Sequence, residues 1–222
     1  MPHQLRLQFP QPAKNRLKKQ RPSLEYEQRW YAQGYTRIAG LDEVGRGPLA
    51  GPVVAAAVIL PQGCNIENID DSKRLSELQR VKLYTQIMDV AAAVGIGVVS
   101  EQIIDRINIL QASLQAMQMA IDNLNIQPDS LLLDAVTLPE CRLPQCGIIK
   151  GDQKSVSIAA ASIIAKVHRD NLMVELDTQY PEYGFAKHKG YATKQHITAI
   201  QQFGLCQIHR KTFVTHLLSG GK

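Results

Sequence analysis

Two adjacent carboxylates at the end of an apolar run are the side chains of this sequence best suited to chemistry. Asp42 and Glu43 follow Ile-Ala-Gly-Leu, and the sequence Gly-Arg-Gly-Pro begins at Gly45. Carboxylates can hold a hard cation, whereas glycine amides and an arginine fork suit a phosphate. A solvated acidic pair in a turn is the alternative, but the glycines and Arg46 beside the pair favour a binding site.

Two later segments repeat this arrangement. Leu-Leu-Leu leads to Asp134, and Gly-Ile-Ile-Lys-Gly leads to Asp152. A single aspartate at such a position is more often a turn or cap residue than a ligand. The ends of strands in one sheet can converge, however, so the acids of all three segments are candidates for one site. The candidate acids are Asp42, Glu43, Asp134 and Asp152.

Several polar residues are candidates for contact with phosphate groups. Lys73 follows Asp-Asp-Ser and could bind a phosphate, or equally pair with an acidic neighbour. Ser155 and Ser157 stand where a long helix should begin, and the N-terminus of a helix attracts anions. Lys166 and Arg169 lie more than one turn further along that helix, and Lys166 is included among the candidate contacts.

The stretch that follows Tyr180 interleaves aromatic with basic residues. Tyr191 lies there in the sequence His-Lys-Gly-Tyr-Ala-Thr. This pattern is typical of nucleic-acid contacts, with rings stacked on bases or sugars and cations on phosphates. The alternative is a small helical subdomain whose aromatic residues form its own core. We favour that alternative for Phe185, Phe203 and Phe213, and a substrate contact for Tyr191.

The elements that must position these residues alternate along the chain. Strands are expected at 36–42, 52–60, 94–99, 130–135 and 147–149, and helices at 24–35, 77–90, 101–107, 110–124, 155–178 and 194–203. The first two strands should pair as a hairpin, which fixes Gly-Arg-Gly over the sheet edge. Ser76 is the expected N-cap of its helix. The helix at 110–124 carries one apolar face, formed by Leu110, Leu114, Met117 and Ile121.

Charge is spread unevenly over the 222 residues, which include 25 basic and 20 acidic side chains. Residues 1–22 hold six basic side chains and no acid, whereas residues 23–149 are acidic overall and residues 150–222 are basic overall. Such a division suits a protein that gathers cations at one place and phosphates at another, although solvated faces produce the same pattern. The tail lacks any sustained period and is predicted to be flexible.

Several classes of protein are excluded by composition. A chain that is 45% hydrophobic can bury a full core. No apolar run approaches the roughly 18 residues of a membrane span, and no signal peptide is recognisable. The four cysteines form no Cys-x-x-Cys pair. Reduced thiols in a cytoplasmic protein are therefore expected, with a zinc site at Cys141 and Cys146 as the alternative.

Five segments of this chain together resemble ribonuclease HII. They are GLDEVGRGPLAGPVVAAAVIL, DDSKRLSE, the Leu-Leu-Asp-Ala strand, KGDQKSVSIAAASIIAKVHRD and YGFAKHKGYATKQH, which run in order from about Ile38 to Phe213. The resemblance implies an α/β fold, a ribonuclease H-like mixed sheet flanked by helices, with a small C-terminal helical segment. It divides the chain into a basic extension at 1–24, a catalytic domain at 25–182 and a substrate-contacting segment at 183–222.

The resemblance also implies an activity and its residues. The activity is hydrolysis of the RNA strand of RNA·DNA hybrids and cleavage 5′ of ribonucleotides embedded in duplex DNA. Two Mg²⁺ or Mn²⁺ ions would serve it, and the products would carry 5′-phosphate and 3′-hydroxyl ends. The implied metal ligands are Asp42, Glu43, Asp134 and Asp152. The implied readers of the ribose 2′-OH and of the junction are Gly45, Arg46, Gly47 and Tyr191.

Two other functions remain open on the sequence. One is a resolvase-like nuclease with an acidic cluster, which would not require a 2′-OH. The other is a hybrid-binding module without catalysis, for which the four acids would be expendable. We expect a monomer that binds hybrids and ribonucleotide-containing DNA and no membrane. The sequence leaves contact with a sliding clamp open.

Overall fold

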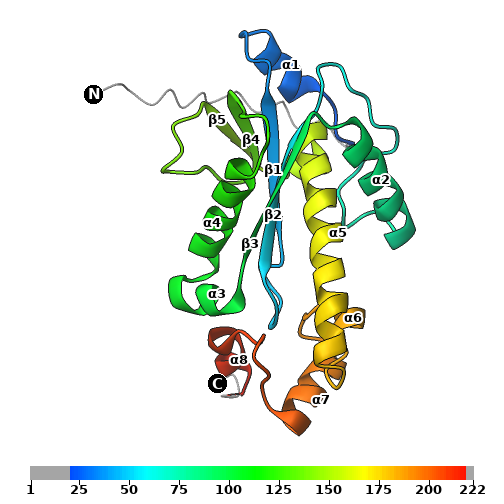
Figure 1. The fold of residues 1–222 in the computed structure, drawn as a ribbon, viewed down its shortest axis with the longest axis vertical. Coiled ribbons are helices and arrows are strands. Elements are labelled where there is room, and N and C mark those ends of the chain that lie inside the picture. Colours follow the sequence, from blue (N-terminus) through cyan, green and yellow to red (C-terminus); the bar gives the residue numbers. More distant parts are fainter. Residues whose placement is uncertain (1–20, 219–222) are drawn as a thin grey trace, which may run out of the picture.

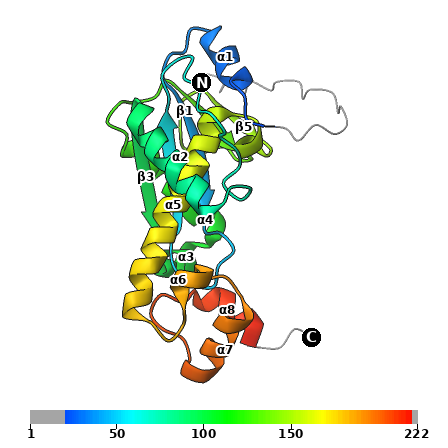
Figure 2. The same ribbon diagram turned by 90° about the vertical axis from the view of Figure 1, so that its right-hand side faces the viewer.

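The structure is a computed structural model that describes residues 21–218. Most of the predicted basic extension at 1–24 therefore lies outside the described residues. Figures 1 and 2 show a central sheet with helices on both faces and a group of short helices at one end. Within residues 21–218, no helix combines the length and the apolar character needed to span a membrane.

Five strands form one mixed sheet in the order β3-β2-β1-β4-β5. They are β1 (Ile38–Val44), β2 (Val53–Ile59), β3 (Ala93–Val99), β4 (Ser130–Asp134) and β5 (Gln145–Ile148). β1 runs antiparallel to β2 and parallel to β4, which itself runs parallel to β5, whereas β2 and β3 are antiparallel. The predicted hairpin and the predicted mixed sheet are confirmed, and β1 lies at the centre.

Helices cover both faces of this sheet (Figure 1). α2 (Glu77–Val90) and α5 (Val156–Gln179) pack on one face, and α3 (Glu101–Ile107) and α4 (Ile109–Asp122) pack on the other. α1 (Glu25–Tyr31) packs through Trp30 against the start of α5. β2 is buried along its whole length, which explains its unbroken run of valine, alanine and isoleucine.

Glycines in the strands let the helices approach closely. A Cβ atom at Gly40 of β1 would lie 2.2 Å from the backbone carbon of Ser157, so only glycine permits α5 to pack there. On the other face, a Cβ atom at Gly97 would lie 2.0 Å from the carbonyl oxygen of Ala116 in α4. The central strand is therefore pressed against α5 at the level of its own carboxylates.

Close packing of α4 also corrects one expectation from the sequence. Met117 and Ile121 are buried as expected, but Leu110 is 46% exposed. The reason is that α4 turns its alanines toward the glycines of β3, which rotates Leu110 away from the sheet. The predicted start of α2 is confirmed, because Ser76 caps the helix and forms a reciprocal capping box with Gln79.

The chain after α5 forms the group of short helices. α6 (Phe185–His188), α7 (Lys194–Phe203) and α8 (Lys211–Leu218) gather around the C-terminal end of α5, with α6 beside its last turns (Figures 1 and 2). They share an apolar cluster with Leu49 and Ala50, from the loop that joins β1 to β2. Phe185 is buried as expected, whereas Phe203, the last residue of α7, is 51% exposed. The β1–β2 loop is thus packed against the C-terminal segment.

Candidate active site

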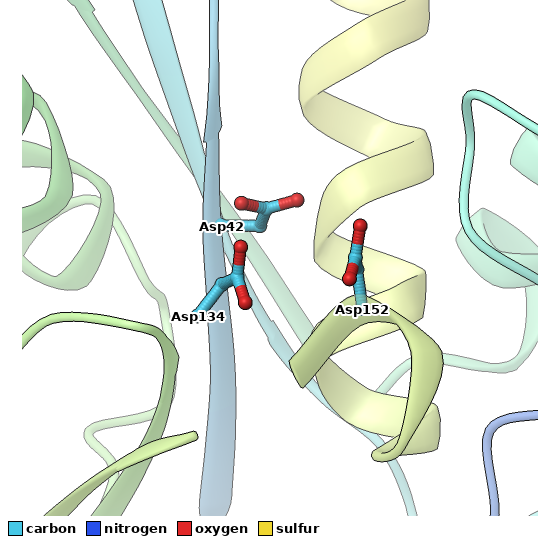
Figure 3. Close-up of side chains that lie close together, drawn as sticks. All are labelled: Asp42, Asp134 and Asp152. Atoms are coloured by element: carbon cyan, nitrogen blue, oxygen red, sulfur yellow. The ribbon is translucent and has the colours of Figure 1, made fainter. Parts of the chain in front are cut away.

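Three aspartates from three different elements meet beside β1. Asp42 lies in β1, Asp134 ends β4, and Asp152 lies in the short 3₁₀ helix η1 (Gly151–Gln153) that follows β5. Each offers one carboxylate oxygen such that the three oxygens lie within 4.8 Å of one another. Figure 3 shows the three carboxylates converging in the space between β1 and α5.

The register of the sheet explains why two of these acids are neighbours. β1 and β4 are parallel with Leu41 opposite Leu133, so the next residues, Asp42 and Asp134, extend side by side. The third acid is brought in by a turn, in which Lys150 has a left-handed backbone with φ of +56°. The Gly151 N–H then donates to Asp134 Oδ1 at 2.7 Å, which ties the turn to β4.

The electrostatics of the cluster are unfavourable in the absence of a ligand. Burial, followed by the charges of Glu43 and Asp134, raises the pKa of Asp42 well above its ordinary value. Burial raises the pKa of Asp134 as well. For Asp152, burial and the charges of Asp71 and Asp134 raise the pKa to about 6. Burial is the largest cause of all three shifts, and repulsion from neighbouring carboxylates adds to it, so a bound cation would favour the charged forms.

One lysine and one serine compensate part of this charge, in addition to the Gly151 N–H. The Lys73 ammonium lies 3.5 Å from Asp152 Oδ2. A hydrogen bond with Ser162 of α5 lowers the pKa of Asp42, against the larger effect of burial. An all-oxygen donor set with surplus negative charge fits a hard divalent cation such as Mg²⁺ or Mn²⁺.

Glu43 does not belong to the group of three aspartates. It follows Asp42 directly in β1, where successive side chains alternate between the two faces, and it is not among the acids whose oxygens lie within 4.8 Å of one another. Its Oε1 accepts a hydrogen bond from Arg46 Nη1 at 3.2 Å, whereas its Oε2 is buried and has no hydrogen-bond partner among the described residues. Burial raises the pKa of Glu43, and the charge of Asp134 contributes to that rise. The charge of Glu43 in turn raises the pKa of Asp42, so Glu43 interacts electrostatically with the cluster, and one of its carboxylate oxygens is left without a partner among the described residues.

The Gly-Arg-Gly sequence and Tyr191 lie together, although 144 positions separate Gly47 from Tyr191 in the chain. A Cβ atom at Gly47 would lie 3.9 Å from Tyr191 Cε1, so the ring stands directly beside that glycine. The Leu49 N–H donates to the Gly190 carbonyl at 2.8 Å and holds the two segments in register. The ring is 42% exposed and is therefore available to a ligand.

A pair of buried histidines supports the backbone of Tyr191. His196 Nδ1 lies 2.9 Å from the Tyr191 carbonyl oxygen, and His196 Nε2 lies 3.0 Å from His209 Nε2. The Cys206 N–H donates to His209 Nδ1 at 2.9 Å, which requires that nitrogen to be an acceptor. Burial lowers the pKa of His209 to about 4, so both rings are neutral at physiological pH.

The structure does not place the predicted serine contacts at an open surface. Ser155 and Ser157 are buried at the start of α5. There the Ser155 hydroxyl and the Ser157 N–H both donate to Glu27 of α1. Glu27 Oε1 accepts from Ser155 Oγ at 2.6 Å and from the Ser157 N–H at 2.9 Å. A carboxylate of the chain itself thus takes the position expected for a phosphate.

The two predicted lysine contacts have internal partners. Lys166 is bonded to Asp170 at 2.7 Å, one turn along α5. Lys73 pairs with Asp152, which was one of the two alternatives for this residue. Its side chain is 75% exposed, however, so Lys73 remains accessible from solvent. Only Lys73 of this pair stands at the acidic cluster.

Several residues that shape the site were missed by reasoning from the sequence. Asp71 and Ser162 carry no local motif that would distinguish them from ordinary loop and helix residues. Arg169 and Arg210 are fully buried, which no pattern of basic residues indicates. Glu27 follows a proline-rich tail, so nothing marks it as the partner of a helix more than 120 residues away. Each of these depends on contacts between distant segments.

Comparisons with known proteins agree with this geometry. A model of the family described as ribonuclease HII matches residues 39–216. The ribonuclease HII of Acetivibrio thermocellus is 56% identical over 193 residues, which cover 87% of this chain and 75% of that protein. The ribonuclease HII of Ruminiclostridium cellulolyticum is 55% identical over 195 residues, covering 88% of this chain and 76% of that protein.

Solved structures give the same result for the fold. Ribonuclease H2 from Pyrococcus horikoshii has a TM-score of 0.68 at 29% identity and covers 82% of this chain and 96% of its own. The ribonuclease HII of Archaeoglobus fulgidus, solved as a complex with PCNA, has a TM-score of 0.65 at 25% identity. The match covers 79% of this chain and 94% of that one. The fold is therefore ribonuclease H-like, and this chain belongs to the ribonuclease HII family and is a hydrolase of the ribonuclease H type.

Proposed function

We propose that this chain is a metal-dependent endoribonuclease that cuts the RNA strand of RNA·DNA hybrids and cuts 5′ of single ribonucleotides in duplex DNA. The observation that supports the proposal is the convergence of Asp42, Asp134 and Asp152 within 4.8 Å, close to the Gly-Arg-Gly loop. The acids can hold cations, and the loop with Tyr191 can read the substrate. A non-catalytic binding module would have no use for such a strained acidic cluster.

The acidic cluster supplies the ligands for two-metal-ion catalysis. Asp42, Asp134 and Asp152 would hold Mg²⁺ or Mn²⁺, with the unpartnered Oε2 of Glu43 as a further donor. When bound, such ions activate water and stabilise charge on the phosphate and the leaving oxygen, which yields 5′-phosphate and 3′-hydroxyl ends. The exposed ammonium of Lys73 would move from Asp152 to the substrate phosphate once cations neutralise the aspartates.

Discrimination of RNA from DNA is assigned to the loop. Arg46 and Gly47 are exposed, and backbone groups without bulky side chains can approach the minor groove and the ribose 2′-OH. The Tyr191 ring beside Gly47 would stack on the deoxyribose that follows the ribonucleotide. Ring stacking tolerates any base sequence, which suits an enzyme that recognises a sugar rather than a base.

The test uses three duplexes that differ only in sugar. One strand is all DNA, carries one ribonucleotide, or is RNA throughout, and the cut is mapped by end-labelling with Mg²⁺, with Mn²⁺ or with EDTA. We expect cleavage of the second and third duplexes, 5′ of the lone ribonucleotide, and none with EDTA. Cleavage of the all-DNA duplex at a similar rate would favour a resolvase-like nuclease, and binding without cleavage would favour a binding module.

A further inference from the structure

Two arginines are buried where the β1–β2 loop meets the C-terminal segment. Arg169 of α5 and Arg210, which precedes α8, have no exposed surface. Among the described residues, neither forms an ion pair with a carboxylate. Burial lowers the pKa of Arg169 to about 10 and that of Arg210 to about 9, so both remain cationic at neutral pH. A buried cation without a counter-ion is costly unless its donors are satisfied.

The donors of both arginines are satisfied by backbone carbonyls of the loop at 45–52. Arg169 donates from Nε to the Pro52 carbonyl at 2.9 Å and from Nη2 to the Ala50 carbonyl at 3.1 Å. Arg210 donates from Nε to Gly51 at 2.9 Å, and its Nη2 reaches Gly45 at 2.6 Å and Gly51 at 2.8 Å. Its Nη1 reaches the Arg46 carbonyl at 3.0 Å. One loop therefore gives five of its carbonyl groups to two guanidinium groups.

While the carbonyl groups of the loop are occupied by the arginines, several of its backbone N–H groups have no partner among the described residues. Within residues 21–218, no hydrogen bond involves the N–H groups of Gly45, Arg46 or Gly47. The carbonyl groups of Gly45 and Arg46 are held inward by Arg210. Since a peptide unit directs its C=O and N–H to opposite sides, engagement of these two carbonyls turns the N–H groups of Arg46 and Gly47, which are both exposed residues, away from Arg210 and toward an approaching ligand. Donors suit a phosphate or a hydroxyl oxygen.

Arg169 also connects this loop to the segment that carries Tyr191. Its Nη1 donates to the Lys189 carbonyl at 3.0 Å, whereas its other nitrogens hold the 45–52 loop. Gly45 has φ of +92°, and a Cβ atom there would lie 2.3 Å from Arg169 Nε. The glycine is thus required for close contact with the guanidinium as well as for its backbone angle.

We infer that Arg169 and Arg210 are positioning residues that clamp the 45–52 loop and set its register against Tyr191, so that cleavage occurs at one position relative to the ribonucleotide. This inference rests on the proposed function, because it assigns a task to the loop that reads the substrate. The two arginines touch neither the acidic cluster nor, by our assignment, the substrate. They act through the backbone they hold.

The test replaces each arginine by lysine, which keeps the charge but lacks the planar fork. The single nitrogen of a lysine cannot reproduce the four hydrogen bonds that Arg210 forms from three nitrogens, so Arg210→Lys should cut a lone ribonucleotide on the order of 10- to 100-fold more slowly. The cut should also spread to neighbouring positions. Affinity for Mn²⁺, measured by calorimetry without substrate, should equal that of the parent.

Two controls separate positioning from simple loss of stability. Arg37→Lys makes the same substitution at the surface and should change nothing, and Ile121→Val supplies a protein whose melting temperature can be matched to the lysine variants. If Arg169→Lys and Arg210→Lys cut at the rate and position of the matched control, the clamp is purely structural and the inference is wrong. If the parent itself does not cut a lone ribonucleotide, the proposed function has failed instead.

Hydrogen exchange on the parent protein provides a test that needs no variant. The Leu49 and Gly51 amides donate to Gly190 and Ile208, so the clamp should slow their exchange. The amides of Arg46 and Gly47 should exchange fast and become slower when a ribonucleotide-containing duplex is added with Ca²⁺ in place of Mg²⁺. Rapid exchange at Leu49 and Gly51 in the free protein would show a loop that is not held, and would contradict the inference whatever the lysine variants do.

Discussion

The acidic cluster and the 45–52 loop are connected through β1, which carries Asp42 and leads into the loop, yet the charges of the cluster are poorly compensated whereas the polar groups of the loop are well satisfied. The aspartates of the cluster repel one another, and burial with mutual repulsion raises the pKa of Asp152 to about 6. In the loop, by contrast, buried arginines satisfy the backbone carbonyls. The difference suits the proposed roles, since a metal site can be completed by its cations, whereas a loop that reads a substrate has to be ordered beforehand.

The largest effect is expected from removing one charge of the cluster. Asp134→Asn preserves the shape and the acceptor for Gly151, but should lower single-turnover cleavage by about 1,000-fold or more, the scale seen for central catalytic groups. Binding of the duplex, measured by fluorescence anisotropy, should persist. Asp122→Asn on the exposed side of α4 is the matched control and should cleave normally. Near-parental cleavage by Asp134→Asn would exclude the proposed metal ligands.

The strain of the cluster should be visible in stability without metal. The pKa of Asp152 is raised to about 6 in the folded state, so the folded protein holds this proton more tightly than the unfolded chain does. The contribution of Asp152 to the free energy of unfolding is therefore fully present below about pH 4 and is lost as the pH rises through about 6. Asp152→Asn should therefore be more stable than the parent at pH 8, by about 1–3 kcal/mol at about 1.4 kcal/mol per pKa unit. The advantage should vanish near pH 4.

Thermal unfolding in EDTA and in Mg²⁺ provides the measurement. Added Mg²⁺ should stabilise the parent and leave Asp152→Asn nearly unchanged, because a ligand stabilises only the form that binds it. A parent that is as stable as Asp152→Asn at pH 8 in EDTA would show that the cluster is not strained. The contrast between the cluster and the loop would then disappear.

A smaller effect is expected at the loop. Tyr191→Ala should slow cleavage at a lone ribonucleotide by about 10-fold, since ring stacking contributes about 1–3 kcal/mol and a sugar lies at the low end. Tyr191→Phe should be nearly normal, because the ring and not the hydroxyl acts. Neither variant should change Mn²⁺ affinity. Parental rate and cut position in Tyr191→Ala would place the ring among the structural contacts of its segment.

The smallest effect is expected from the basic extension, which lies outside both regions. Deleting residues 1–20 removes five basic side chains and should weaken duplex binding mainly at low salt. Each lost phosphate contact changes the slope of log K against log salt by about 0.9. The cut position should be unaffected, since phosphate contacts carry no information about the ribonucleotide. An unchanged slope would show that the extension does not contact the duplex.

Much of the fold followed from local sequence. The buried run of β2 and the Ser76 cap are encoded in neighbouring residues, so their elements were predicted within a few positions. Asp42 and Asp134 could be grouped because both end apolar strands, and parallel pairing then places them side by side. Glu43 was a candidate for the same site, but it is not among the three acids whose oxygens meet.

The rest depended on contacts that no local pattern records. Ser155 and Ser157 were expected to meet a phosphate, but a distant carboxylate from α1 occupies their donors. Arg210 stands in a His-Arg-Lys run that suggests a solvated face, yet it is buried against the β1–β2 loop. Such residues are recognised only when the partner segment, more than 100 positions away, is in place.

The contact between Glu27 and the start of α5 has a consequence for where the folding unit begins. The family match starts at residue 39, but Glu27 and the fully buried Trp30 lie before it and close the helix on which the acidic cluster rests. A fragment trimmed to the matched residues would lose the acceptor of the Ser157 N–H and of the Ser155 hydroxyl and would expose the first turn of α5. The shortest autonomous form of this protein therefore has to retain α1, so its boundary is set by the helix cap rather than by the motif.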